Sequence, residues 1–272
     1  MSFKLCLLIF LAACQAAYPD LLFKPLFANP FEPRIGSIYQ FDSKKLRLDI
    51  GASVDLVTLK TSDSLKFSAG ADFFTYTRLR SENNFKFPVE TSDYYFGINT
   101  AFKGQIGSMD VSTRVRLAHI SSHLVDGMAV GGTFTETPFV YSREFVEFTG
   151  TLVYGGLRYY AGFNWAFSTK PDDTKVFTPH IGFDTEKPMP LGFLNDLTGL
   201  DMNFLFGVDM KFINVEGHSS EATSSQIGLL IKTSDSAGLI ISYYNYYGKS
   251  IHGMFYDLND RYQGIGFQVY FY

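Results

Sequence analysis

The sequence has 272 residues, of which 17% are aromatic and only 18% are charged. So few charges are unusual for a surface that meets water on every side, and an apolar environment explains the deficit. The net charge of −4, without any basic stripe, argues against a nucleic-acid partner.

The first residues have the pattern of an export signal. An apolar run, Leu5 to Ala13, follows a single lysine and is too short to span a bilayer. We therefore expect residues 1–17 to be a signal peptide that is removed. Two cleavage positions remain open: after Ala16, or before Cys14, because Leu11-Ala12-Ala13-Cys14 resembles a lipoprotein box.

Both cysteines, Cys6 and Cys14, lie in this region. The mature chain then has no thiol pair, which excludes a disulfide, a Cys-based metal site and a Cys nucleophile there.

Beyond the signal, the chain repeats segments of alternating apolar and polar residues, rich in Phe, Tyr, Val and Gly. Their lengths suit tilted membrane strands, and no stretch approaches the roughly 18 apolar residues of a membrane helix. The last segment places Ile265, Phe267, Val269 and Phe271 on one face. Its end at Tyr272 resembles the aromatic C-terminal signal by which outer-membrane barrels are recognised for assembly.

The alternation predicts twelve strands, an even number that favours closure of a barrel. They are expected at 35–41, 46–58, 64–77, 92–104, 108–122, 139–153, 157–167, 175–184, 201–213, 223–233, 237–246 and 261–272. We therefore predict an all-β fold, a transmembrane antiparallel up-and-down β-barrel over residues 35–272.

Connection lengths distinguish this barrel from a soluble sandwich, because such barrels have short periplasmic turns and longer outer loops. Short turns are expected at 61–63, 104–107, 154–156 and 234–237. Longer loops are expected at 78–91, 123–138, 214–222 and 247–260. Residues 185–200 break the rule as a long loop on the short-turn side.

Residues 18–34 are too rich in proline for a strand. Two placements remain open for this Pro-rich N-terminal arm: outside the barrel in the periplasm, or inside the lumen as a plug.

The strand predicted at 108–122 carries the most informative side chains. Arg114 and Arg116 share one face, and a charge that faced lipid near the midplane would cost about 2–4 kcal/mol. That face should line the lumen. The outward parity then holds Val111, Thr113, Val115, Leu117, His119, Ser121 and His123, with the last three at the extracellular rim.

Glu144, on the next strand, has the parity of its lipid-facing residues. If the hairpin is centred near residue 131, Glu144 lies level with His119. Ser121 as nucleophile, His119 as base and Glu144 as orienting carboxylate would form a set that activates a hydroxyl. Our first hypothesis is therefore hydrolysis of acyl esters of outer-leaflet lipids. The competing interpretation is that these are ordinary rim residues.

The lumen suggests a second class of function. Arg114, Arg116, Arg143 and Glu147 are predicted to point inward, where they could form a salt-bridge plug or line a narrow pore. The alternative is thus a non-enzymatic outer-membrane barrel, acting as a small channel or as an envelope-structural protein.

We expect neither a metal nor another cofactor, because His119 and His123 are two strand repeats apart, about 13 Å. The expected partners are outer-membrane lipids and, through the C-terminal strand, the barrel-assembly machinery. The expected location is the outer membrane of a Gram-negative bacterium. The oligomeric state is left open.

Three segments resemble the bacterial family catalogued as domain of unknown function twelve hundred and seven, over nearly all the mature chain. They are Ala28-Asn29-Pro30-Phe31-Glu32-Pro33-Arg34, His119-Ile120-Ser121-Ser122-His123-Leu124-Val125-Asp126-Gly127 and Ser142-Arg143-Glu144. The second keeps the family's two histidines and two serines but replaces its Gln, Gly and Glu. The resemblance implies an exported protein, not a reaction.

More distantly, His119-x-Ser121 resembles the His-x-Ser of outer-membrane phospholipase A and of the lipid A deacylases. That likeness implies an outward-facing catalytic pair near the outer leaflet. The chain departs from both motifs at Ser122, where they have Asn.

Overall fold

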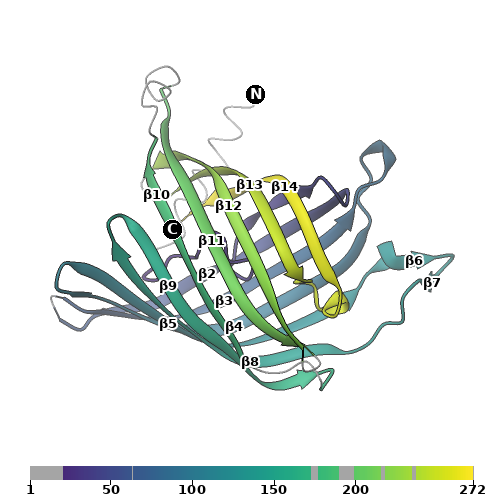
Figure 1. Ribbon diagram of the computed structural model, residues 1–272, viewed down its shortest axis with the longest axis horizontal. Helices are drawn as coiled ribbons and strands as arrows, with labels where there is room; N and C mark the ends of the chain where they lie inside the picture. Colours follow the sequence, from purple (N-terminus) through teal and green to yellow (C-terminus); the bar gives the residue numbers. More distant parts are fainter. Residues whose placement is uncertain are drawn as a thin grey trace.

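The computed structural model describes residues 21–62, 64–172, 177–189, 199–215, 218–234 and 237–271. Within them, twelve antiparallel strands close into one barrel, which confirms the predicted fold class (Figure 1). In chain order the barrel strands are β1 (Ile35–Gln40), β2 (Lys45–Lys60), β3 (Lys66–Arg80), β4 (Val89–Ile106), β5 (Met109–Leu124), β8 (Tyr141–Tyr154), β9 (Leu157–Lys170), β10 (Phe177–Pro188), β11 (Asp201–Val215), β12 (His218–Ser234), β13 (Ala237–Lys249) and β14 (Asn259–Tyr270).

Short elements lie outside the barrel wall. The strands β6 (Ala129–Val130) and β7 (Thr133–Phe134) form a small hairpin that projects from the barrel in Figure 1. The part of the chain that the structure describes also contains three single-turn 3₁₀ helices, η1 (Asn83–Phe85), η2 (Asp126–Met128) and η3 (Gly253–Phe255). No helix in the described part of the chain is long and apolar enough to cross a membrane.

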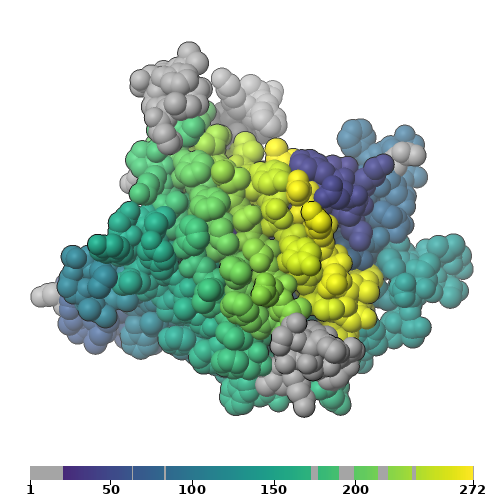
Figure 2. Space-filling view, in the orientation of Figure 1, coloured from purple at the N-terminus to yellow at the C-terminus, as the bar shows by residue number. Residues whose placement is uncertain are grey.

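The barrel closes where β1 pairs with β14, from Ile35 opposite Val269 to Gln40 opposite Gly264. In Figure 2 the yellow C-terminal strand accordingly lies against the purple N-terminal part of the chain. Closure leaves no free strand edge, so every strand of the wall has two pairing partners.

Side chains alternate between the outer surface and the lumen, as a two-residue period requires. On β13, Ile241 and Tyr243 are about two-fifths exposed on the outside, whereas Ile240 and Tyr244 are buried inside. Ile265 of β14 is likewise half exposed. The wall therefore has an apolar outside, as the alternation predicted.

The two ends of the barrel differ in connection length. At one end, β8 and β9 are joined by Gly155 and Gly156 alone, both with positive φ, which suits a two-residue hairpin turn. At the other end, 125–140 and 250–258 form long connections. We refer to these as the turn end and the loop end.

Two expected loops are partly strand. The long loop expected at 214–222 is wrong, because β11 continues to Val215 and pairs there with His218 of β12. The polar composition suggested a loop, but barrel strands continue past the apolar band, where Ser and Thr suit an extended backbone. Similarly, β10 extends to Pro188, and the remaining residues 190–198 lie outside the described residues.

Residues 21–34 of the arm lie inside the barrel. The backbone N–H groups of Leu22 and Phe27 donate to the carboxylates of Asp55 and Asp184, at 2.8 and 3.1 Å. Arg47 donates to the carbonyl oxygen of Pro30 at 2.7 Å. Side chains of the wall thus replace the ladder that a Pro-rich segment cannot make. Of the two placements, these contacts match the lumenal one.

The signal peptide expected at residues 1–17 and its boundary with the arm stay predictions. Residues 1–20, with both cysteines and both cleavage positions, lie outside the described residues, as does Tyr272.

A candidate active site on the outer surface

The candidate residues come from two neighbouring strands. β5 and β8 pair antiparallel, with His119 directly opposite Glu144 and Ser121 opposite Ser142. The predicted level of Glu144 is therefore the observed one. The intervening loop and hairpin leave this register intact, because 125–140 are accommodated beyond the strand ends.

This set lies on the outer surface. The side chains of His119 and Glu144 are 39% and 36% exposed. Leu117, two residues before His119, is 48% exposed, whereas Arg116 on the opposite face is fully buried. Strand parity thus sorts the charged and apolar side chains of β5 onto the two predicted faces.

A hydrogen bond links the histidine to the carboxylate. The His119 Nδ1 lies 2.9 Å from Oε1 of Glu144, and the hydroxyl of Ser142 donates to the same oxygen at 3.1 Å. A carboxylate at Nδ1 fixes the ring orientation and the tautomer in which Nε2 can accept a proton. Ser142 was not foreseen, although its spacing of two from Glu144 places both on one face.

Ser121 lies one strand repeat from His119 on the same face, opposite Tyr94 on the other side. Its hydroxyl makes no hydrogen bond to the His119 ring in this structure. Catalytic hydrogen bonds are often long or misaligned before substrate binds, so Ser121 stays a candidate nucleophile without this contact.

Aromatic side chains flank the set. The ring of Phe96 lies 6.4 Å from that of His119, and the ring of Tyr94 lies 5.9 Å from that of His123. Phe96 is 45% exposed, and Ile98 beyond it 63%. The polar residues therefore stand at the margin of a broad apolar surface. Among the described residues, no cluster of three or more His, Cys, Asp or Glu could hold a metal ion.

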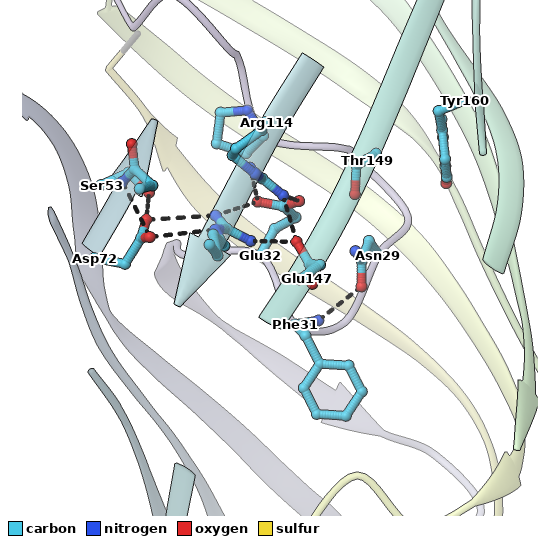
Figure 3. A network of polar contacts seen from close by, with 12 residues as sticks. Asn29, Phe31, Glu32, Ser53, Asp72, Arg114, Glu147, Thr149 and Tyr160 are labelled. Carbon is cyan, nitrogen blue, oxygen red and sulfur yellow. Dashed lines mark hydrogen bonds and ion pairs between the residues drawn. The ribbon is translucent and has the colours of Figure 1, made fainter. Parts of the chain in front are cut away.

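The predicted lumenal charges form a network with the arm (Figure 3). Arg114 and Arg116 contact both Glu32 of the arm and Glu147 of β8, at 2.5 to 3.3 Å. Asp72 of β3 contacts Arg116 at 3.2 Å. All five side chains are less than a tenth exposed. The network matches the salt-bridge plug rather than a charged pore lining.

Sequence reasoning missed the part that Glu32 plays. The sequence feature that could have revealed this role is the excess of positive charge among the predicted lumenal side chains. That excess required a further carboxylate from elsewhere in the chain. The arm supplies it.

A loop fills the opposite end of the lumen. In 250–258, Met254 and Phe255 are buried. Asp93 of β4 accepts hydrogen bonds from the backbone N–H of Gly253 at 2.8 Å and pairs with Nδ1 of His252 at 2.7 Å. The arm and this loop thus occupy the lumen from its two ends.

Solved structures show what this fold resembles. Outer membrane phospholipase A from Escherichia coli matches with a TM-score of 0.55 at 12% identity, over 95% of this chain and 96% of that chain. An active-site mutant of that phospholipase gives 0.56 with the same identity and coverage. The β domain of the Bordetella autotransporter Brka gives 0.47 at 10% identity, over 87% and 96%. At such identities the phospholipase likeness shows the fold alone, that of an outer-membrane barrel.

No curated protein matches the sequence. The family model described as protein of unknown function (DUF1207) matches residues 9–272. That range includes the arm motif and both strand motifs on which the resemblance was based. The chain therefore belongs to the DUF1207 family.

Proposed function

We propose that this protein resides in the bacterial outer membrane and hydrolyses acyl esters of outer-leaflet lipids, with Ser121 as nucleophile, His119 as base and Glu144 as orienting residue. The observation that carries the proposal is the 2.9 Å contact between His119 and Glu144 on the apolar outer surface. This contact gives the outer surface a base with an orienting carboxylate, which is what a hydroxyl nucleophile needs for activation.

The position along the strand supports an outer-leaflet substrate. Barrels of this class place short turns in the periplasm and long loops outside. His119 and Ser121 lie in the last third of β5, close to the loop end. Ser121 would thus lie at the same depth in the membrane as an ester group at the headgroup boundary of the outer leaflet.

The chemistry follows from the pairing. His119 Nε2 accepts the Ser121 proton as the Ser121 oxygen attacks the ester carbonyl, and Glu144 stabilises the resulting imidazolium through Nδ1–H. The imidazolium then protonates the departing alcohol, which leaves an acyl-serine. Water, deprotonated by the same ring, hydrolyses this intermediate and releases the fatty acid.

Fatty-acid release tests the proposal. The purified protein in detergent should release fatty acid from phospholipid or lipopolysaccharide, and Ser121→Ala should lose that activity while keeping heat-modifiable migration. Ser122→Ala is the matched control, because Ser122 points into the lumen and is buried there. It should remain active. If the wild type releases fatty acid from neither phospholipid nor lipopolysaccharide, the proposal is refuted.

The filled lumen favours one form of the alternative function. A barrel occupied by its own arm and by 250–258 suits an envelope-structural role better than conduction. If no lipid is hydrolysed, that role becomes the better account.

A further inference from the structure

A cavity of about 100 Å³ remains in the lumen between the arm and the loop 250–258. An engineered apolar cavity of about 150 Å³ holds benzene, so this one has room for an apolar group of roughly four heavy atoms. Its wall contains seven aromatic rings, those of Phe31, Tyr76, Tyr95, Tyr141, Phe145, Tyr246 and Tyr256. The space is thus shaped by rigid side chains from the arm, the wall and the loop.

The charges around this cavity do not balance. Glu147 in its lining is already shared by Arg114 and Arg116, and Lys211 pairs with Asp209 at 2.9 Å. Arg143 also lines the cavity, but its guanidinium makes no hydrogen bond or ion pair within the described residues, and its Nε is buried without a partner. The centre of the Tyr141 ring lies 5.1 Å from its guanidinium carbon.

A second group in the cavity lining lacks a hydrogen-bond partner. The buried hydroxyl of Tyr95, which lines the cavity, has no partner, although its side chain is only 1% exposed. Arg143 is only partly exposed and has no counter-charge in the described part of the chain, and an unpaired buried hydroxyl such as that of Tyr95 is costly.

We propose that this cavity binds a small organic carboxylate with a short apolar tail, held by Arg143. A guanidinium offers two parallel donors that match a carboxylate, and the aromatic walls would cover an apolar tail of a few carbons. Tyr95 can donate a further hydrogen bond. This site is on the opposite face of the wall from His119, so the proposal does not depend on lipid hydrolysis.

Calorimetry with the full mature protein in detergent tests the site, with butyrate as the probe. Butyrate should bind, and butyramide, of the same shape without the charge, should bind about ten- to a hundredfold more weakly, since a charge-assisted hydrogen bond contributes about 1.5–3 kcal/mol. Arg143→Gln should weaken butyrate binding by a similar factor. Arg261→Gln, which removes the same charge from an exposed position outside the cavity lining, should not.

A second variant tests the site independently, in case Arg143→Gln does not fold. Ile120→Phe keeps every charge but fills part of the cavity, and it too should weaken butyrate binding at least tenfold. Undetectable binding of butyrate to the wild type would overturn the proposal. So would equal affinity for butyrate and inorganic phosphate, because the aromatic walls would then contribute nothing.

Discussion

His119 faces outward from β5 and contacts the Glu144 carboxylate of the neighbouring strand through Nδ1. A two-residue period assigns every side chain of β5 to a face once Arg114 and Arg116 are assigned to the lumen. The level of Glu144 followed from hairpin symmetry, and its pairing with His119 agrees. The contact of Ser142 with Glu144 could not be foreseen, because a rotamer is not encoded in the strand period.

Glu144→Gln tests the orienting role. If the proposed hydrolysis occurs, loss of the charge should lower kcat on the order of 10²-fold or more with little change in KM, because the carboxylate stabilises an imidazolium that forms only during reaction. The steady-state kinetics of fatty-acid release provide the measurement. A variant with wild-type kcat would contradict the role of Glu144.

Glu32→Gln tests the lumenal network. Removing this charge leaves Arg114 and Arg116 with less buried counter-charge, so the free energy of unfolding should fall by about 3 kcal/mol. Thermal unfolding followed by circular dichroism in detergent measures the loss. Glu136→Gln, at an exposed loop position, should change stability by less than about 0.5 kcal/mol. Equal stability of the two variants would show that the network does not hold the arm.

At the scale of elements, all twelve barrel strands were predictable, because period-two alternation and turn residues recur along the chain. The boundaries of these strands were less predictable than their number. β11 and β12 extend through the expected loop at 214–222, since pairing at a rim depends on the neighbouring strand and not on local hydropathy. The inward fold of 250–258 was also missed, because its anchors are non-local.

Asp93→Ala tests the anchoring of this loop. The substitution removes the acceptor for Gly253 and the partner of His252, so the loop should leave the lumen more often. Chymotrypsin should then cleave after Phe255 faster than in the wild type. Asp110→Ala, at the exposed turn end, provides the control and should leave cleavage unchanged. Equal cleavage of all three proteins would mean that Asp93 does not secure the loop.

At the scale of the whole molecule, alternation and connection lengths predicted a closed barrel but not its filled interior. The arm contains no repeat that reveals its location, and both placements were compatible with its prolines. Its backbone hydrogen bonds to wall side chains, such as that of Leu22 to Asp55, depend on residues far apart in sequence.

Planar-bilayer recordings test the closure of the lumen. The wild type should show no steady conductance, because the arm and the loop 250–258 obstruct the lumen separately. Deleting residues 21–34 or residues 251–256 alone should leave conductance low, and deleting both should raise it markedly. Steady conductance in the wild type would contradict the plug and favour a channel.

Covalent trapping tests whether the outward-facing Ser121 is a nucleophile at the lipid surface. A sulfonyl fluoride with a long alkyl chain should partition to the outer surface and sulfonylate Ser121, with release of fluoride, and mass spectrometry of the digest should locate the adduct. We expect one modified serine, Ser121, and no modification in His119→Ala. An unmodified Ser121, or an adduct confined to the lumenal Ser122, would contradict it.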